Sequence, residues 1–500
     1  MTYRFGPFQL DSVGFLLRRG NQPVSLQPKA LDLLLLLAAR RGALLTKDDI
    51  LRTLWPDVNV TDNALTQVVS DLRHALGDSP ASPSYIQTVA RRGYRFVAPV
   101  EEIPSDEPHR QTWGVFDLTD ASVSARIGVR ETASLDAYRS FTEARLKLEA
   151  LDPAQVPSAM VDFNRAIALD PRFTLAYVGR AHARFWRFEA SRVRNCPDGA
   201  ELHAAIVDVR RAIELDPDLA EAHAGLALFL SAAGRPEEAR DAGRRAVALE
   251  PGNWRQLFRL GFAAWGDERL ECFRQVIGRY PEFPYTYFGS AMVHIARGDL
   301  SSAERCLGDG LAFESESPDR QERFPGRGLH WLLGACRLAA GDSESAHREF
   351  DRELRTRGAD LYAAEHGINA YDGHGFAFLS EDADTRAAEM FERSLEIVPD
   401  HARSLIGLAA VGRTSALDRA RRAIQELRAN ERTSEVALTS SLLLVVERRE
   451  SEAIEQLDRW LSEAPSGPAG WTLPIEPLLA RLKTDPRFAA VRARLEIRAR

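Results

Sequence analysis

The chain has 500 residues, of which 45% are hydrophobic and 27% are charged. This composition is typical of a folded protein with several domains and excludes an intrinsically disordered chain. The net charge of −7 hides an asymmetry, because residues 1–100 contain 12 Lys/Arg and 8 Asp/Glu, a net +4, which leaves −11 for the other 400. A basic first segment ahead of an acidic remainder predicts that only the first segment meets a polyanion.

The cysteine pattern and the apolar runs both bear on location. The four cysteines are scattered, with no C-x-x-C pair and no metal-ligand spacing, which predicts reduced thiols. The longest apolar runs, residues 33–39 and 442–446, are far shorter than the roughly 20 residues needed to cross a bilayer. We therefore expect a cytoplasmic protein with no membrane segment.

The first 56 residues predict short strands followed by two helices. Alternation over Tyr3–Leu10 and an apolar-rich run at residues 13–17 predict antiparallel strands. A helix is expected from Pro28 to Gly42, and Thr46 is the expected N-cap of a second helix, which Pro56 ends.

The stretch from residue 62 to 76 predicts an amphipathic third helix, after a polar loop. Its apolar side chains fall at spacings of three and four: Leu65, Val68, Val69, Leu72, Ala75 and Leu76. The opposite face carries Asn63, Thr66, Gln67, Ser70, Arg73 and His74. These side chains suit phosphates and base edges, although periodicity alone fits an ordinary solvated face better.

The next stretch predicts a basic β-hairpin. Residues 86–89 and 94–97 alternate on either side of a turn at Gly93, and the hairpin carries Arg91, Arg92 and Arg95. Arginines on a small hairpin predict a phosphate or minor-groove contact. A polar helix followed by such a hairpin is the arrangement with which a winged helix binds DNA.

Residues 3–98 resemble an OmpR/PhoB-type winged-helix domain. The matching segments are FGPFQLD, VSLQPKALDLLLLLAARRGALLTKDDILRTLWPD, ALTQVVSDLRHALGD and YIQTVARRGYRF. The resemblance implies that the third helix enters the major groove of double-stranded DNA and that the hairpin reaches the adjacent minor groove. It also implies that the loop after the second helix contacts RNA polymerase, with Leu54, Trp55, Pro56 and Asp57 as the candidate contacts.

One departure from the family pattern, and the position at which the sequence starts, affect the expected mechanism. Many members carry more Arg/Lys on the third helix than Arg73 alone, so pairing on DNA, as a homodimer or with a partner, is an expected route to affinity. The sequence starts at the first strand of the domain, and we therefore expect no attached phosphoacceptor receiver. A protein of this kind would be associated with the bacterial nucleoid when bound to DNA.

The remainder predicts a linker and an all-α repeat, so that the domains are residues 1–99, 100–134 and 135–500. The phrase Ala-x-x-Leu-Asp/Glu-Pro recurs at 166–171, 212–217 and 246–251, and the last two are 34 residues apart, the tetratricopeptide (TPR) period. A turn residue also stands five positions before an alanine at Gly234, Gly298, Gly341 and Arg448. The fold class is thus an α+β winged helix-turn-helix followed by an all-α TPR superhelix. About eight or nine helix pairs are expected, with residues 312–385 irregular and capping helices over 477–495.

Several residues of the repeat region invite a sharper interpretation. His366 and His374 lie in AEHGINAYDGHGF, which we interpret as a glycine-rich loop with polar histidines and not as a metal site. Cys196, beside a proline, is expected to be a loop thiol. Four tryptophans in helical context are expected in the core: Trp186, Trp254, Trp265 and Trp331.

The sequence carries no phosphate-binding loop, zinc-protease, nucleophile-elbow or dinucleotide motif, so neither an enzyme nor a cofactor is expected. The leading hypothesis is a one-component, sequence-specific DNA-binding transcription regulator. Its TPR body would recruit a protein or peptide partner in its groove, or set the oligomeric state. The alternatives are a TPR scaffold whose winged-helix head binds protein rather than DNA, and a small-molecule sensor in the repeat groove.

Overall fold

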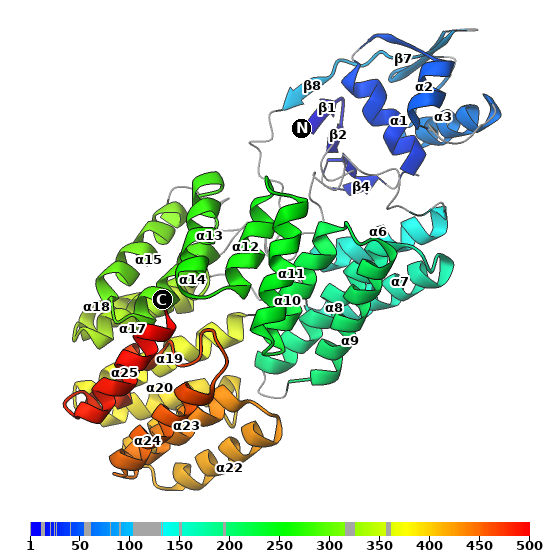
Figure 1. Cartoon of the computed structure of the whole chain (residues 1–500). Helices are drawn as coiled ribbons and strands as arrows, with labels where there is room; N and C mark the ends of the chain where they lie inside the picture. The colour runs from blue at the N-terminus through cyan, green and yellow to red at the C-terminus, as the bar shows by residue number, and fades with distance from the viewer. Residues whose placement is uncertain are drawn as a thin grey trace. The chain divides into compact units, whose positions relative to one another are not determined.

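The computed structural model describes residues 2–11, 16–20, 22–24, 26, 28–40, 42–54, 62–80, 82–89, 92–103, 132, 134–149, 153–193, 197–315, 326–356 and 362–500 (Figure 1). The chain divides into two compact units. One is centred on the N-terminal winged-helix region, residues 2–103, which we call the head. The other contains residues 177–500, which we call the body.

An antiparallel sheet opens the head, with strand order β4-β3-β2-β1-β8. Its strands are β1 (Thr2–Phe5), β2 (Phe8–Asp11), β3 (Leu16–Arg19), β4 (Gln22–Val24) and β8 (Glu101–Ile103). The predicted run from Tyr3 to Leu10 is two strands, because Gly6, with φ of +52°, reverses the chain and sets Phe5 opposite Phe8. Strand β8 lies within the stretch expected to be linker and pairs with β1; three residues are too few to show alternation.

Three helices and a second small sheet complete the winged helix. The helices are α1 (Pro28–Ala39), α2 (Lys47–Leu54) and α3 (Asp62–Leu76), and the sheet has the order β5-β7-β6, from β5 (Leu44–Thr46), β7 (Gly93–Phe96) and β6 (Ile86–Val89). Thr46 caps α2 as predicted, since the Asp49 N–H donates to Thr46 Oγ1 at 3.1 Å. Buried leucines of α1 and α3 fill the core between the layers.

The body is an array of antiparallel helix pairs (Figure 1). The helices α6 (Leu135–Glu149) and α7 (Val156–Leu169) precede it in the chain. The helices of the body are α8 (Thr174–Val193), α9 (Gly199–Leu215), α10 (Ala220–Ala232), α11 (Pro236–Leu249), α12 (Trp254–Ala263), α13 (Gly266–Arg279), α14 (Pro284–Ala296), α15 (Leu300–Ser315), α17 (Leu329–Ala339), α18 (Ser343–Arg355), α19 (Ala363–Ser380), α20 (Asp384–Ile397), α21 (Ala402–Ala410), α22 (Ser415–Ala429), α23 (Thr433–Val446), α24 (Glu450–Glu463) and α25 (Pro486–Arg498). The first helices of successive pairs contact one another and form an inner layer. Among the described residues, no helix is both long and apolar enough to cross a membrane.

The turns inside the pairs confirm the predicted spacing between a turn residue and an alanine. Gly234, Gly298, Gly341 and Arg448 all have φ between +63° and +89°. The alanines five residues later, Ala239, Ala303, Ala346 and Ala453, are fully buried. Asp382, with φ of +57°, makes the same turn before the buried Ala387. The turn at Asp382 was not predicted from the sequence, because an aspartate stands where glycine is preferred.

The interpretation of residues 364–376 as a glycine-rich loop is wrong, because these residues belong to the helix α19. A Cβ added at Gly373 would lie 2.6 Å from the ring of Phe350, and one added at Gly375 would lie 2.6 Å from the ring of Phe391. The two glycines therefore let phenyl rings from α18 and α20 pack directly on the helix backbone. The region expected to be irregular likewise contains α17, α18 and α19, which continue the array.

The remaining core predictions hold where the structure describes them. Trp186 is buried, and Trp254, Trp265 and Trp331 pack half-buried against apolar clusters. Cys272 and Cys336 are buried free thiols, and burial raises the pKa of each to about 12. Cys196 lies outside the described residues.

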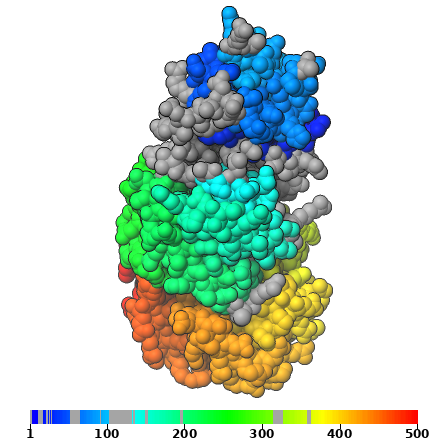
Figure 2. Space-filling view, turned by 90° about the vertical axis from the view of Figure 1, so that its right-hand side faces the viewer, coloured from blue at the N-terminus to red at the C-terminus, as the bar shows by residue number. Residues whose placement is uncertain are grey.

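Contacts between residues distant in sequence draw the body into a closed turn. Arg192 at the end of α8 pairs with Glu365 at the start of α19, with Nη2 and Oε2 2.9 Å apart. Arg432 Nη1, from the residue before α23, donates to the Arg192 carbonyl at 3.4 Å. In the space-filling view, the green and the yellow-orange segments of the body accordingly adjoin on one face (Figure 2).

The chain ends with a segment that crosses the inner layer, which we call the strap (Ser466–Leu482). It contains two short 3₁₀ helices, η2 (Leu473–Ile475) and η3 (Pro477–Leu482), and leads into α25. The predicted capping residues are all buried: Leu478, Leu479, Leu482, Phe488, Val491 and Leu495. At the far end, Arg297 Nε donates to the Ala499 carbonyl at 2.9 Å.

Candidate nucleic-acid interface

Helix α3 has one buried face and one exposed face, as the spacing of its apolar side chains predicts. Leu65, Val68, Val69, Leu72 and Leu76 are buried in the head core, and Ala75 is half-buried. Thr66, Gln67, Ser70 and His74 are exposed on the other side. The Asn63 side chain lies outside the described part of the head.

Arg73 differs from its neighbours on the outer face because its guanidinium reaches the hairpin. Its Nη2 donates to the Ile86 carbonyl at 2.8 Å and to Thr88 Oγ1, also at 2.8 Å. Both acceptors belong to β6. Since a guanidinium held by two acceptors has a fixed orientation, Arg73 acts as a brace between the helix and the hairpin.

Asp78, just after α3, fixes the start of the hairpin in the same way. Its Oδ1 accepts from the backbone N–H of Ser84 at 2.6 Å and of Tyr85 at 3.3 Å, and its Oδ2 accepts from Ile86 N–H at 2.8 Å. Asp78 was not among the residues predicted from the sequence. A carboxylate directly after a helix-ending glycine was the available signal, because such a residue commonly binds nearby backbone N–H groups.

The hairpin turn places Arg92 at the surface. Its N–H donates to the Val89 carbonyl at 3.0 Å, and its own carbonyl accepts from Lys47 N–H, at the start of α2, at 3.3 Å. Arg95 is half-buried on β7, between the buried Tyr94 and Phe96. Arg91 lies outside the described residues.

Close packing fixes the hairpin from behind. A Cβ on Gly93 would lie 1.9 Å from the Leu45 carbonyl oxygen, so strands β5 and β7 meet at a distance that glycine alone permits. The rings of Phe5 and Phe96 pack edge to face with centroids 5.0 Å apart. The hairpin is thus held against the N-terminal sheet as well as against α3.

The charges of this surface are unequally distributed. On α3, Gln67 Nε2 donates to Asp71 Oδ1 at 2.9 Å, which places an acid beside the exposed polar face. The exposed side chains described on this face, Thr66, Ser70 and His74 with Gln67, are suited to base edges and water-mediated contacts. On the described part of the hairpin, Arg92 is an exposed arginine, and its charge is suited to phosphates.

The expected polymerase-contact loop is described only at its first residue. The Leu54 side chain is buried in the head core, and its carbonyl accepts from Lys29 Nζ at 2.8 Å. Burial raises the pKa of Asp32, and the charge and hydrogen bond of nearby Lys29 offset part of this rise. Trp55, Pro56 and Asp57 lie outside the described residues.

Two histidines in the body lie in direct contact. His347 Nδ1 and His374 Nδ1 are 2.6 Å apart, a hydrogen bond that requires one of them to lack a proton. Over the described ranges, no group of three or more His, Cys, Asp or Glu is arranged to hold a metal ion.

One family model and two curated relatives match the head. The family described as "Transcriptional regulatory protein, C terminal" (Trans_reg_C) matches residues 21–96. The transcriptional activator CadC of Escherichia coli is 38% identical over 90 residues, which cover 18% of this chain and 17% of that protein. The cholera toxin homolog transcriptional activator of Vibrio parahaemolyticus is 37% identical over 86 residues, covering 17% and 30%.

The chain is also similar to a solved structure. The DNA-binding domain of E. coli CadC is 32% identical and covers 20% of this chain and 94% of that domain, with a TM-score of 0.19 over the whole chain. The chain spans less than a third of the length of the two curated relatives. The N-terminal part of this chain is an OmpR/PhoB-type DNA-binding domain.

Proposed function

We propose that this chain is a sequence-specific regulator of transcription that binds double-stranded DNA through α3 and the hairpin. The observation that carries the proposal is the exposed polar face of α3, held at a fixed geometry to the hairpin by Arg73. A DNA-binding surface needs this arrangement, because the helix and the hairpin must enter neighbouring grooves together. The names of the two relatives, both transcriptional activators, support it.

The side chains divide into three roles in this proposal. Thr66, Gln67, Ser70 and His74, together with Asn63, face the base edges of the major groove. Arg91, Arg92 and Arg95 anchor the hairpin to phosphates or the minor groove. Arg73, which the sequence placed among the base-contacting residues, positions the hairpin instead.

The body supplies the control in this proposal. Its inner layer binds a protein or peptide partner, or it sets an oligomeric state such as a homodimer, and thereby decides when the head occupies DNA. The loop of Leu54, Trp55, Pro56 and Asp57 contacts RNA polymerase; Leu54 takes part through its backbone, since its side chain is buried.

Salt-dependent gel shifts with the full chain test the proposal. Gln67→Ala/Ser70→Ala should reduce the preference for the specific site over random DNA about tenfold. Arg92→Ala should weaken both and lower the slope of log K against log salt by about 0.9. The matched control is Arg19→Ala, an exposed arginine on β3 in the other sheet. If all variants bind DNA like the wild type, the head does not bind DNA with this surface, and the scaffold alternative replaces the proposal.

A further inference from the structure

The strap makes contacts unlike those of a repeat helix. It follows α24 as a proline-rich stretch, with Pro468, Pro474 and Pro477, and it crosses first helices of several pairs. Its η2 turn contacts α14 and α17, and its η3 turn contacts α23. The strap therefore runs across the inner layer, as an extended ligand would in a repeat groove.

Four side chains anchor the strap at separate points. Ser466 Oγ donates to Glu237 Oε1 of α11 at 2.8 Å. The Trp471 ring packs edge to face on Phe288 of α14, with centroids 6.4 Å apart. Ile475 is buried in the apolar cluster of α14 and α17. Glu476 is buried and meets Arg403 of α21.

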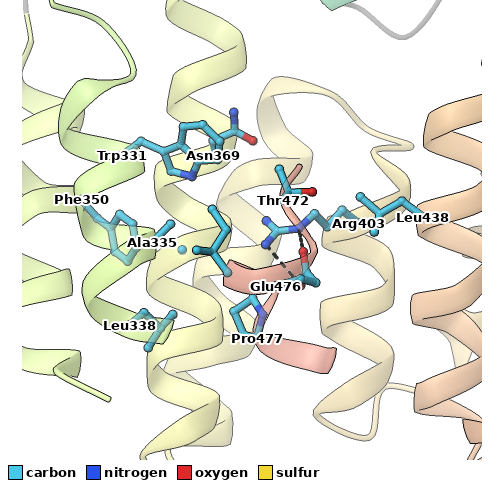
Figure 3. Close-up of a pocket in the computed structure, with 12 residues that line it drawn as sticks. Trp331, Ala335, Leu338, Phe350, Asn369, Arg403, Leu438, Thr472, Glu476 and Pro477 are labelled. Carbon is cyan, nitrogen blue, oxygen red and sulfur yellow. Dashed lines mark hydrogen bonds and ion pairs between the residues drawn. The ribbon is translucent and has the colours of Figure 1, made fainter. Parts of the chain in front are cut away.

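Arg403 forms a carboxylate-binding site for that glutamate. Its Nε is 3.1 Å from Glu476 Oε2 and its Nη2 is 3.5 Å from Oε1, a two-pronged arrangement (Figure 3). Asp372, itself fully buried, holds the third nitrogen from behind, with Nη1 and Oδ2 3.5 Å apart, while Ser404 Oγ donates to Asp372 Oδ1 at 2.7 Å. The guanidinium also lies over the Phe376 ring at 4.5 Å. Such fixed orientation is what recognition of a planar carboxylate requires.

The strap leaves part of the groove unfilled. Beside the ion pair lies a cavity of 170 Å³, with Trp331, Phe350 and Leu338 on one side and Arg403 with Glu476 on the other (Figure 3). An apolar cavity of about 150 Å³ accommodates a benzene ring, so this partly open pocket is large enough for an aromatic side chain. The space suits one aromatic side chain larger than Ile475, which lines it.

We propose that the strap is an intramolecular occupant of a peptide-binding groove, and that a partner peptide with a bulky apolar residue followed by glutamate displaces it at Arg403. The inference deepens the proposed function, since it rests on the body being the part that receives a partner. Displacement concerns residues 466–477; the leucines of η3 stay in the core formed with α23 and α25. The free chain is then the closed state, and the partner opens it.

Fluorescence anisotropy with a labelled peptide tests the proposal on the full chain. The probe is the ten-residue peptide of residues 469–478, AGWTLPIEPL. Trp471→Ala/Glu476→Gln, which loosens the strap, should bind it at least tenfold more tightly than the wild type does. A peptide with Glu476→Gln should bind at least tenfold more weakly, and one with Ile475→Phe should bind about threefold more tightly because it fills the cavity.

The receptor side has a matched pair of variants. In the loosened background, Arg403→Gln should abolish binding, while Arg419→Gln, at an arginine of α22 that bonds the Pro399 carbonyl, should leave it unchanged. The proposal is overturned if the loosened chain melts cooperatively yet shows no saturable binding, or if the glutamate of the peptide makes no difference.

A measurement on the wild type covers the case in which the variants do not fold. Excess peptide should speed amide hydrogen exchange in residues 470–477 and leave exchange in α24 unchanged. Unaltered exchange throughout the strap at millimolar peptide counts against displacement.

Gel shifts on the same samples separate the two proposals. Absence of DNA binding both with and without peptide, together with intact peptide binding, overturns the regulator alone, and DNA binding without any peptide binding overturns only the strap.

Discussion

Two arginines illustrate how differently the head and the body are assembled. Arg73 holds β6 through acceptors 13 and 15 residues away in the sequence. Arg403 holds Glu476, which is 73 residues away. The brace in the head therefore joins two elements of one short stretch, whereas the ion pair in the body forms only once the C-terminal strap has returned to α21. Changes in the head should act locally, and changes in the body should act across the array.

Gly93→Ala should have the largest effect and should remain confined to the head. The new methyl group would lie 1.9 Å from the Leu45 carbonyl, so β5 and β7 must separate, at a cost of more than about 3 kcal/mol. Calorimetry of the full chain should show the head transition lowered or lost and the body transition unchanged.

Gly20→Ala is the matched control for this substitution. Gly20 also has a positive φ, +60°, but nothing within 4 Å of an added Cβ, so it should cost about 1 kcal/mol. Equal effects of the two substitutions would contradict the close approach of the strands.

Gly373→Ala should destabilise the body by about 1–2 kcal/mol. Overlap with the Phe350 ring outweighs the gain of roughly 1 kcal/mol that alanine brings to a helix interior. Gly367→Ala on the same helix meets only an ordinary contact, 3.5 Å from Ile397 Cδ1, and should stabilise it. Urea unfolding measures both, and a stabilising Gly373→Ala would show that the packing against Phe350 is loose.

Acidification should weaken the body through His374. Burial, and then the charge of His347, lower the pKa of His374 to about 4, against about 6.5 in an unfolded chain. Between these values the unfolded chain binds more protons, so the free energy of unfolding falls as pH falls, by about 2 kcal/mol from pH 7 to 5. The groups around the pair are Asp351, Glu381 and Arg386.

Urea unfolding at several pH values checks the prediction by comparing the wild type with His374→Gln. Burial also lowers the pKa of His182 and His401, so the wild-type slope has the same sign from several groups. The slope of the free energy of unfolding against pH should be smaller in the variant than in the wild type by the contribution of His374, which corresponds to about one bound proton. Identical slopes would contradict it.

Arg73→Ala should have a modest effect and the clearest signature. It should weaken DNA binding about tenfold without changing the salt slope, because its guanidinium is bound to the hairpin and releases no counterion. Arg92→Ala, by contrast, should reduce the slope. A reduced slope for Arg73→Ala would mean that Arg73 leaves the hairpin on DNA and contacts a phosphate.

Whether a feature could be predicted from the sequence depends on how far apart its interacting residues lie in the chain. The apolar stripe of α3, the Thr46 cap and the turns before buried alanines were predictable, because each depends on neighbours within about five residues. The brace made by Arg73 was not, since helical periodicity gives the direction of a Cα–Cβ bond and says nothing of where a long side chain ends.

The interpretations that the structure corrected fail for the same physical reason. Gly373 and Gly375 suggested a loop because glycine usually marks flexible backbone, while the rings that explain them stand on α18 and α20. The role of Asp78 depends on backbone groups up to eight residues away. The ion pair of Glu476 with Arg403 joins elements that no local pattern connects.

The closure of the body also has a consequence for how it unfolds. An open repeat array contacts only its nearest neighbours, so its ends fray and its units melt in sequence. Here Arg192 reaches Glu365, and Arg297 reaches the Ala499 carbonyl 202 residues away, which ties early units to late ones. Because of these contacts, the unfolding of one helix pair removes contacts that stabilise another pair far away in the sequence. The body should therefore unfold as one cooperative transition, and removing its last helix should weaken α13 and α14 as much as the neighbouring α24.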